Sequence, residues 1–470
     1  SYFLKYDAKQ VRKMKPYPPL ATLLTAAVLR EGGYELTLFD AMLSEGEDEF
    51  EARLEEERPD VVAILEDNFN FLTKMCTTRM REAAHRMIAA SRDAGCRVVV
   101  NGSDASDHPE LYLEAGADAV LLGETEETLP ELLDCWAKGR SPRDVAGLAL
   151  SGENATPVRK TPPRPFVEHL DGLPLPAWDL VDVERYRRAW TAAHGRLSWN
   201  MVTTRGCPYH CNWCAKPLYG VRYAQRSPEN VAEELRLLKE RVAPDHVWFA
   251  DDIFGLTPRW IERFAEEVTS RDARLPFTIQ SRVDLMRPSA VASLAAASAE
   301  EVWMGVESGS QRILDAMDKG TRIEQIKEAT RLLRSHGIRA SWFLQLGYSG
   351  EEWDDILLTR DLVREERPDD VGVSVSYPLP GTVFYERVKE QLSGKRNWSD
   401  SDDLAMMFQG TYDGGFYKRV RDLLHDEALT ASGSGLSVRS LDERWRALSE
   451  AETSHRSERP TLELPRAALL

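Results

Sequence analysis

The chain has 470 residues, of which 42% are hydrophobic and 29% charged, and its formal net charge at pH 7 is −17. This length and composition exclude a single small module and predict a globular protein of two or three domains. The longest aliphatic runs are far shorter than the ~20 residues that cross a bilayer, and the acidic balance opposes contact with phosphate backbones, so we predict neither a membrane span nor a nucleic-acid partner.

Six cysteines in a chain of this length are too few for a disulfide scaffold. The sequence shows no secretory signal with a basic start, an apolar run and a small-residue cleavage site, so we predict a cytoplasmic protein. Ser1 is followed closely by the turn at 17–19, and we expect that some residues of the natural N-terminus, and a first strand with them, are absent.

Helical and extended patterns alternate over residues 1–150. Apolar residues at helical spacing over 20–28 end at the glycine pair 32–33 and precede a short apolar strand at 36–39. The repeats that follow predict strands at 61–65, 97–101 and 119–122 and helices at 73–94, 109–114 and 126–138. Buried aliphatic strands that alternate with helices predict a doubly wound, Rossmann-like parallel sheet.

The rest of the chain divides into three segments. Residues 151–198 are rich in proline, which predicts a linker. Residues 199–395 contain six strand-and-helix repeats, which predict a partial (β/α)6 barrel of the TIM type with its site at the carboxyl ends of the strands. The expected strands lie near 200–204, 246–250, 277–281, 302–306, 340–346 and 371–376. Residues 396–470 predict a small α-rich region that is partly or wholly flexible from 432 onward.

Three thiols, Cys207, Cys211 and Cys214, lie within eight residues directly after the first barrel strand. A zinc site would need a fourth ligand, and His210 is adjacent to Cys211, where it could hardly bind the same ion. Thiolates also bind iron–sulfur clusters, and three ligands on a four-iron cube leave one iron open to a small molecule. The three thiols therefore favour an iron–sulfur cluster over zinc, and the resemblance described next implies a [4Fe-4S] cluster at the catalytic centre, with these thiols as its ligands.

This C-x3-C-x2-C spacing, with the aromatic Trp213 before the third cysteine, resembles the radical S-adenosylmethionine superfamily. The resemblance implies that the amino and carboxylate groups of S-adenosylmethionine bind the open iron. It also implies that an electron from the cluster cleaves the sulfonium to a 5′-deoxyadenosyl radical, and that Trp213 packs near the adenine. An external electron donor similar to flavodoxin or ferredoxin is implied as well.

Polar groups follow the next barrel strands as they do in that superfamily. They are Asp251 and Asp252 after the second strand, Gln280, Ser281 and Arg282 after the third, and Glu307 and Ser308 after the fourth. By resemblance these residues bind S-adenosylmethionine, with Glu307 near its ammonium or ribose hydroxyls and Arg282 near its carboxylate. The alternatives are a helix cap for the acidic pair and a salt-bridged scaffold role for Arg282.

The fifth barrel strand departs from the pattern. Members of the superfamily commonly carry a Gly-x-Pro-Gly-Glu turn, whereas residues 347–351 are Gly-Tyr-Ser-Gly-Glu. Tyr348 is therefore a candidate catalytic residue that faces the site, and core packing explains it equally well.

A doubly wound sheet ahead of such a barrel resembles the cobalamin-binding subclass of the superfamily. Glycine and small hydroxyl residues follow two expected strands, where doubly wound sheets bind ligands. The candidate cobalamin contacts there are Gly102, Ser103, Asp104, Gly123, Glu124 and Thr125. No Asp-x-His-x-x-Gly stretch occurs in the first 150 residues, which implies base-off cobalamin without a histidine lower ligand. Asn68, Phe69 and Asn70 are candidates for the lower face of the cofactor, and a loop with two core phenylalanines is the alternative.

The resemblance implies a C-methyltransferase that moves a methyl group from S-adenosylmethionine, through methylcobalamin, to an unactivated or aromatic carbon of a small natural-product intermediate. A cobalamin-dependent oxidative or ring-rearranging cyclase shares the same motifs. Less favoured alternatives are a methylthiotransferase, with a second cluster on Cys76, Cys96 and Cys135, and a non-enzymatic cobalamin or redox sensor.

Overall fold

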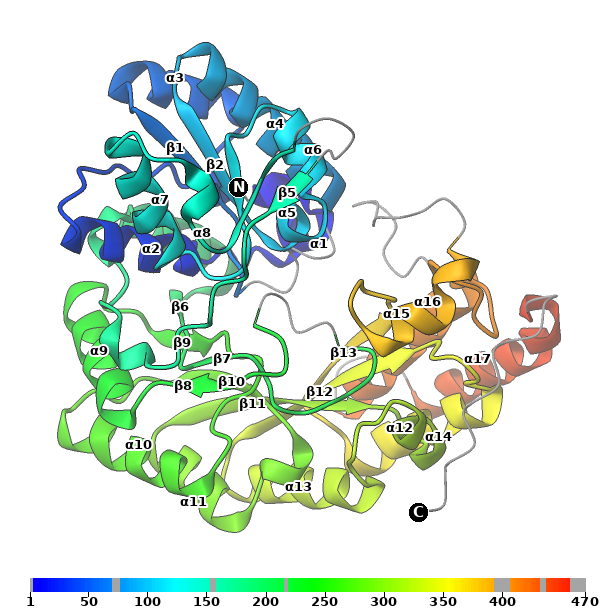
Figure 1. Cartoon of the computed structure of the whole chain (residues 1–470). Helices are drawn as coiled ribbons and strands as arrows, with labels where there is room; N and C mark the ends of the chain where they lie inside the picture. Colours follow the sequence, from blue (N-terminus) through cyan, green and yellow to red (C-terminus); the bar gives the residue numbers. More distant parts are fainter. Residues whose placement is uncertain are drawn as a thin grey trace.

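The computed structural model describes residues 3–69, 77–152, 158–214, 219–392, 406–431 and 437–456. Two α/β units make up most of the molecule, and Figure 1 shows the N-terminal unit above the larger second unit. Among the described residues, no helix is both long and apolar enough to cross a bilayer.

The N-terminal unit is built on a five-stranded sheet in the order β1-β2-β3-β4-β5. Its strands are β1 (Val61–Leu65), β2 (Arg97–Asn101), β3 (Ala119–Leu121), β4 (Leu148–Ser151) and β5 (Val158–Lys160). The first three strands are parallel, and β4 and β5 form an antiparallel extension that continues past residue 150. The helical segments are η1 (Leu4–Tyr6), α1 (Ala8–Lys13), α2 (Leu20–Glu31), η2 (Ala41–Leu43), α3 (Glu47–Glu57), α4 (Thr77–Asp93), α5 (Ser103–Asp107), α6 (Pro109–Glu114), α7 (Thr128–Ala137) and η4 (Pro142–Asp144).

Helices cover both faces of this sheet. Val98 and Val100 of β2 belong to the apolar core that includes residues of α4, whereas Val99 belongs to the core that includes residues of α7. Because successive strand residues point to opposite faces, both faces of β2 are buried, and the aliphatic run is explained. The predicted doubly wound, Rossmann-like unit is confirmed.

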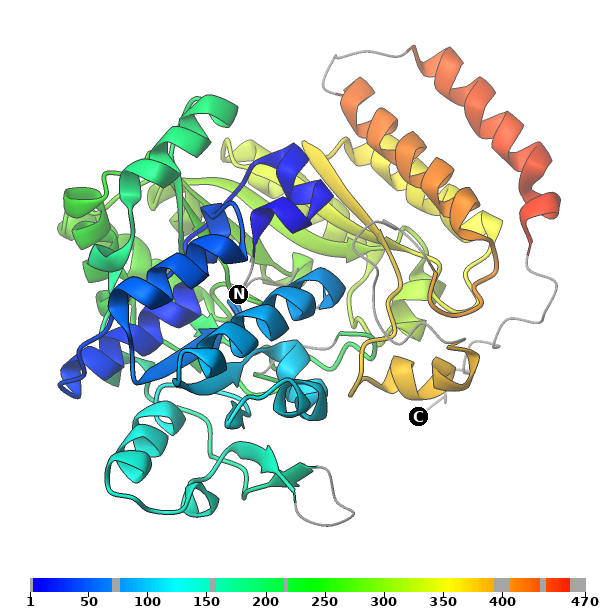
Figure 2. The ribbon, with the colours of Figure 1, turned by 90° about the horizontal axis from the view of Figure 1, so that it is seen from above.

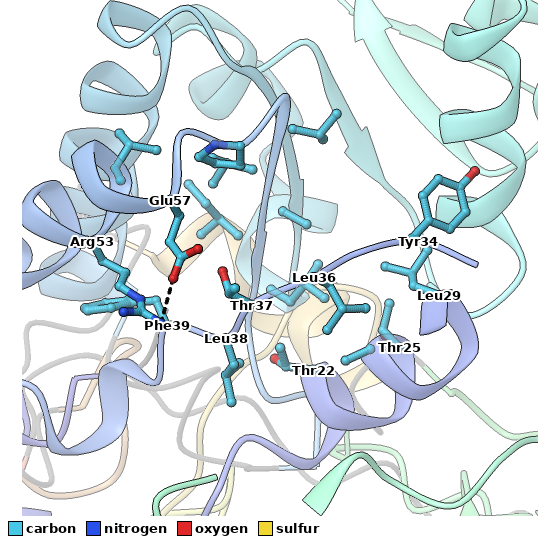
Figure 3. A pocket seen from close by; sticks show the side chains of 18 of the residues that line it. Thr22, Thr25, Leu29, Tyr34, Leu36, Thr37, Leu38, Phe39, Arg53 and Glu57 are labelled. Carbon is cyan, nitrogen blue, oxygen red and sulfur yellow. Dashed lines mark ion pairs between the residues drawn. The ribbon is translucent and has the colours of Figure 1, made fainter. Parts of the chain in front are cut away.

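The strand expected at 36–39 is wrong. β1 is the edge strand of the sheet, and segment 34–40 belongs to no strand or helix. Both β1 and this segment line a cavity of about 940 Å³, and Figure 3 shows Leu36, Thr37 and Leu38 around it. A strand needs a neighbouring backbone to complete its hydrogen bonds, so a short apolar run alone mispredicts this segment. None of the described residues 207–214, which carry the three thiols, lines this cavity.

The second unit contains a six-stranded parallel sheet in the order β13-β12-β11-β10-β9-β6. Its strands are β6 (Ser198–Met201), β9 (His246–Phe249), β10 (Phe277–Ser281), β11 (Ala299–Glu307), β12 (Arg339–Leu346) and β13 (Asp370–Val375). Because β6 and β13 are the two edges of this sheet, the barrel is open, and the predicted partial (β/α)6 barrel is confirmed. A separate antiparallel pair consists of β7 (Thr204–Arg205) and β8 (Ala224–Gln225).

Helices follow the strands on the outer side of this sheet. The helical segments are η5 (Leu170–Gly172), η6 (Trp178–Leu180), α8 (Val183–His194), α9 (Pro228–Arg241), α10 (Pro258–Ser270), η7 (Val283–Leu285), α11 (Pro288–Ala296), α12 (Gln311–Ala316), α13 (Ile323–Ser335), α14 (Trp353–Glu366), α15 (Val383–Val388) and η8 (Lys389–Gln391). Local sequence sets their starts: Ser227 and Thr257 accept a backbone N–H in the first turns of α9 and α10, and proline follows each. The large apolar core of this unit lies between the sheet and these helices.

The C-terminal region is α-rich, as predicted. It contains α16 (Gly414–Ala431), α17 (Val438–Ala451) and η9 (Glu452–His455). Figure 2 shows α16 and α17 side by side. Trp445 of α17 is 2% exposed, and its indole N–H donates to Glu427 at 2.7 Å. This part of the segment expected to be flexible is therefore a packed helix.

Candidate functional site

The three clustered thiols lie between β7 and β8, on residues 206–223, which we name the cysteine loop. Cys207, Cys211 and Cys214 are half-buried and form no disulfide. The loop is held to the barrel by backbone contacts, since the N–H of Asn212 donates to the carbonyl of Met317 at 3.0 Å. The loop that joins β7 to β8 thus carries three thiol ligands shortly after the first barrel strand.

Arg282 lies beside the sulfur of Cys211. Its Nη1 is 3.8 Å from Cys211 Sγ, and its Nη2 donates to the Lys319 carbonyl at 2.9 Å. The guanidinium also pairs with Asp284 at 2.9 Å and stacks over the Tyr209 ring at 3.7 Å. Arg282 is therefore salt-bridged, as the scaffold alternative predicts, and its positive charge lies beside a thiol, while its contact with the carboxylate of S-adenosylmethionine stays a prediction. A cation in this place would offset the negative charge of a metal-bound thiolate.

Glu307 pairs with Lys319, a residue that sequence analysis missed. Glu307 Oε1 and Lys319 Nζ are 2.7 Å apart, and each side chain is 7% exposed. Burial lowers the pKa of Lys319, but Glu307 and Cys211 raise it more, so the pKa lies above its ordinary value. Glu307 has a φ of 64°, which a residue with a Cβ adopts only at a cost. The backbone at the end of β11 thus holds this carboxylate in place against a cation close to Cys211.

The two acidic residues after β9, Asp251 and Asp252, lie in different environments. Asp251 is 2% exposed, and its carboxylate accepts hydrogen bonds from the N–H groups of Thr203 and Thr204 at 2.6 and 2.8 Å. Burial raises the pKa of Asp251 to about 6, although these hydrogen bonds lower it. Asp251 therefore fastens the connection between β6 and β7, whereas Asp252 is exposed.

Tyr348 lies beneath the cysteine loop. It is 1% exposed, stacks on Phe384 with ring centroids 5.0 Å apart, and its hydroxyl is 2.9 Å from both Asn212 Oδ1 and the Ala316 carbonyl oxygen. Because Asn212 stands between Cys211 and Trp213, this contact supports the loop from within the core. The same apolar cluster includes Trp213 as a partly buried neighbour.

The remaining residues predicted to bind S-adenosylmethionine lie at the ends of β10 and β11. Gln280 is half-buried, and Ser281 is 6% exposed. Ser308 is fully buried, and its hydroxyl accepts the N–H of Ser310 at 3.1 Å. Ser308 thus shapes the turn into α12, and its binding role stays a prediction, like that of Gln280.

These residues fit an iron–sulfur cluster with a small polar ligand. The thiols are soft donors, Cys211 has cations beside it, and Ser281 Oγ and Trp213 Nε1 are buried without a hydrogen-bond partner among the described residues. Within the same ranges, no three His, Cys, Asp or Glu side chains are gathered closely enough to hold a single metal ion.

A second group of polar residues lies where β1, β2 and β3 end. We name residues 66–69, 101–106 and 122–126 the sheet edge, by which we mean the carboxyl ends of these strands and not the edge strand β1. The Asn101 amide donates to the carbonyls of Leu121 and Gly123, each at 3.0 Å, and accepts from Asn68 at 2.9 Å. A Cβ on Gly102 would lie 2.1 Å from a carboxylate oxygen of Glu66, so a larger residue there would have to displace the Glu66 side chain. One asparagine thus joins all three strand ends.

Several polar atoms at and beside the sheet edge are buried without a partner in the part of the chain that the structure describes. They are Glu66 Oε2, Asn68 Oδ1, Ser103 Oγ, Ser106 Oγ and Thr128 Oγ1. Burial raises the pKa of Glu66 to about 7. Buried polar groups normally have partners, and this end of a doubly wound sheet is where ligands bind. The sheet edge therefore fits a large ligand with many hydrogen-bonding groups, as cobalamin is.

Three of the predicted cobalamin contacts are engaged within the protein. Asp104 accepts two hydrogen bonds from Arg81, at 2.6 and 2.7 Å, and one from Tyr112 at 2.6 Å. Thr125 and Thr25 hydroxyls are 2.5 Å apart. Glu124 pairs with Arg205 of β7 at 2.5 Å. The motifs identified these positions at the sheet edge, but they did not indicate these partners, which come from distant parts of the chain.

The candidates for the lower face of cobalamin lie on the loop after β1. Asn68 is 8% exposed, Phe69 stacks on Tyr219 with ring centroids 5.5 Å apart, and Asn70 lies outside the described residues. Cys96 and Cys135 belong to different apolar cores, and Cys76 is not described. Cys96 and Cys135 therefore share no site, and the alternative of a second cluster finds no support in them.

Two family models match the chain. The B12 binding domain matches residues 15–133, and the Radical SAM superfamily matches residues 201–363. Hopanoid C-3 methylase of Methylococcus capsulatus is 29% identical over 385 residues, which cover 80% of this chain and 69% of the relative. Anaerobic magnesium-protoporphyrin IX monomethyl ester cyclase of Rubrivivax gelatinosus is 26% identical over 391 residues, with 80% and 67% covered.

A solved structure has a similar fold over most of the chain. The radical S-adenosylmethionine methyltransferase TsrM of Kitasatospora setae, with cobalamin and a [4Fe-4S] cluster bound, superposes with a TM-score of 0.66 at 21% identity. The match covers 81% of this chain and 74% of that one. The similarity supports the arrangement of a sheet domain ahead of an open barrel.

Proposed function

This chain belongs to the cobalamin-dependent radical S-adenosylmethionine enzymes, and on that premise we propose that it methylates a carbon atom of a small molecule, with S-adenosylmethionine as the methyl source. The observation that carries the proposal is the three-thiol loop, with Arg282 against Cys211, in the same chain as a sheet edge with buried polar atoms that have no partner. Methylase relatives such as the hopanoid enzyme support carbon as the acceptor.

When bound, the cluster supplies single electrons, S-adenosylmethionine supplies the methyl and radical-forming groups, and cobalamin supplies a methyl carrier. Cys207, Cys211 and Cys214 would hold the cluster, and Arg282 and Lys319 stabilise negative charge on its sulfur ligands. Glu307 would bind the ammonium or ribose hydroxyls of S-adenosylmethionine, and Trp213 would pack against its adenine.

The sheet edge would hold cobalamin in the base-off form. Asn68, Gly102 and Ser103 would contact it, and Phe69 would lie near its lower face, where no histidine motif is available. We propose a small substrate that is neutral or cationic, because the chain is strongly acidic. The electron donor similar to flavodoxin or ferredoxin and the cytoplasmic location stay predictions from the sequence.

A cobalamin-dependent cyclase is the second candidate, since the cyclase of Rubrivivax gelatinosus aligns with 80% of this chain. The test uses S-adenosylmethionine with a deuterated methyl group, given to anaerobically reconstituted protein with a strong reductant. Mass spectrometry then measures 5′-deoxyadenosine and deuterated methyl on the extracted corrinoid. We expect both products. 5′-Deoxyadenosine without labelled corrinoid would favour the cyclase, and absence of both products would overturn the proposed function.

A further inference from the structure

Arg205 joins the cysteine loop to the N-terminal unit. It is the last residue of β7, directly before Gly206 and Cys207. Its Nη1 and Nη2 are each 2.5 Å from a carboxylate oxygen, one of Glu124 and one of Glu126. The exposed fractions of the three side chains are only 4 to 5%. One guanidinium thus bridges two buried carboxylates that belong to the other unit.

Two aromatic rings lie beside the same guanidinium. Its Cζ is 5.9 Å from the ring centroid of Phe69 and 5.5 Å from that of Tyr219. These rings stack on each other at an interplanar angle of 21°. Phe69 belongs to the sheet edge and Tyr219 to the cysteine loop. The contact between the two rings therefore joins the same two parts of the molecule as the ion pairs of Arg205 do.

The direction of the chain beyond Arg205 is fixed as well. Gly206 has a φ of 76°, and a Cβ there would lie 2.0 Å from the Arg222 carbonyl oxygen. Only glycine fits this position. Because one residue separates Arg205 from Cys207, a displacement of Arg205 moves Cys207 as well. The position of the first residues of the cysteine loop therefore depends on the contacts of the Arg205 guanidinium.

On the other side, the two glutamates belong to the sheet edge, and contacts continue from them to Asn101 and Asn68. Gly123, which precedes Glu124, accepts a hydrogen bond from Asn101 at 3.0 Å, and Asn101 accepts one from Asn68 at 2.9 Å. Glu124 also accepts the N–H of Val167 in the linker at 2.6 Å. An unbroken series of contacts thus runs from Asn68 to Cys207.

We propose that Arg205 is a positioning residue that sets the separation between the cobalamin site and the cluster site. The inference rests on the proposed function for its two cofactors and deepens it by naming the residue that holds them in register. A misplacement of about 1 Å between reacting groups costs up to about 100-fold in rate. Loss of Arg205 should therefore slow methyl transfer more than cleavage of S-adenosylmethionine, which depends on the cluster site alone.

The test measures the separation directly. Pulsed electron paramagnetic resonance on reconstituted protein reports the distance between the reduced cluster and cob(II)alamin. Wild type should give one narrow distribution, and Arg205→Gln should give a broader or shifted one with unchanged iron and cobalt contents. The ratio of labelled methyl corrinoid to 5′-deoxyadenosine should fall about tenfold. An unchanged distance, or an equal fall in both products, would overturn the proposal.

Folding is controlled with a second variant. Arg205→Gln leaves two carboxylates buried without a cation, which is strongly destabilising. The triple variant Arg205→Gln/Glu124→Gln/Glu126→Gln carries no charge at this position, and it should show the altered distance too. Arg196→Gln is the matched control, because Arg196 pairs with Glu300 at 2.9 Å with 38% and 34% of the side chains exposed. It should retain the distance of wild type.

Hydrogen exchange in cofactor-free protein separates this inference from the proposed function. Arg205→Gln should speed exchange in 122–128 and 203–207 together, and Arg196→Gln should change neither. If wild type binds no cobalamin or cluster, the proposed function fails, and this exchange still tests Arg205. Faster exchange on one side alone would contradict the role of Arg205 as a connection.

Discussion

The two candidate cofactor sites balance their charges differently. At the cysteine loop, each buried cation has its own carboxylate: Lys319 pairs with Glu307, and Arg282 with Asp284. At the sheet edge, burial raises the pKa of Glu66 to about 7 and that of Asp67 to about 6. Neither of these two carboxyl groups has an ion pair with a described cation, whereas the other sheet-edge carboxylates are ion-paired, Asp104 with Arg81 and both Glu124 and Glu126 with Arg205.

This difference indicates which ligand each site suits. Paired charges of both signs at the cysteine loop can exchange partners with a zwitterion that carries a carboxylate and an ammonium, as S-adenosylmethionine does. At the sheet edge, partly neutral carboxyl groups and the amide oxygen of Asn68, which has no partner among the described residues, suit a ligand that binds through many uncharged hydrogen bonds. The contrast supports the separate assignment of the two cofactors, and each prediction below tests one side of it.

The largest expected effect comes from replacing Cys207, Cys211 and Cys214 together with alanine. The variant should lose iron and the cleavage of S-adenosylmethionine, yet retain cobalamin, because the two sites belong to separate units. Metal analysis and the visible spectrum measure both cofactors in one sample. Loss of both from a folded variant would show that the division into two sites is wrong.

Breaking the buried ion pair should cost stability at the cysteine loop. Lys319→Met leaves the Glu307 carboxylate buried and unpaired, so we expect a loss of about 3 to 5 kcal/mol in the free energy of unfolding. The double variant Lys319→Met/Glu307→Gln should recover part of this loss. Lys327→Met is the control, since its pair with Glu365 is 29% and 51% exposed and is worth about 1 kcal/mol at most. Equal effects at Lys319 and Lys327 would contradict the account.

The sheet edge should respond to pH through Glu66. Its pKa is about 7 in the folded protein against an ordinary 4.5, so the folded state binds more protons than the unfolded state between these values. The contribution of Glu66 to stability therefore falls as pH rises through this window. In Glu66→Gln, the loss of unfolding free energy between pH 5 and 8 should shrink by on the order of 1 kcal/mol. Glu114 is an exposed residue of α6, and in the control Glu114→Gln the loss of unfolding free energy between pH 5 and 8 should equal that of wild type.

Tyr348→Phe should have the smallest effect. The hydroxyl contacts Asn212 and Ala316 within the core, and its loss should cost about 1 kcal/mol in stability. Cleavage of S-adenosylmethionine should fall less than about tenfold, because the residue supports the loop rather than the reaction. Abolished cleavage at unchanged iron content would instead establish Tyr348 as catalytic. Tyr34→Phe, beside the cavity of the N-terminal unit, serves as the control.

Features with a local signal were predictable from the sequence. The six barrel strands are marked by aliphatic runs followed by helical periodicity, and the three thiols by their spacing. The failure at 36–39 has a physical cause, because a strand depends on a neighbouring backbone that periodicity does not describe. The α-rich character of the C-terminal region was predicted. The sequence did not indicate, however, which part of residues 432–470 would be flexible and which part would form the packed helix that contains Trp445.

Partners across the chain were not predictable. Lys319 becomes important only when folding brings it to Glu307 and Cys211, and Arg205 only when it meets Glu124 and Glu126 from the other unit. Asp104 and Asp251 have the residue type of a ligand contact, yet Arg81 and Thr203 occupy them. A motif indicates which side chains lie at a strand end, and the fold decides which of them have no other partner.

The central claim is that one chain carries an iron–sulfur cluster with an open iron and a cobalamin in separate sites. Iron, cobalt and zinc analysis of anaerobically reconstituted protein, with a visible spectrum before and after S-adenosylmethionine, tests it most directly. The account predicts about four iron and about one cobalt per chain, and a spectral change at the cluster when S-adenosylmethionine is added. Zinc alone, or a cluster that does not respond to S-adenosylmethionine, would contradict it.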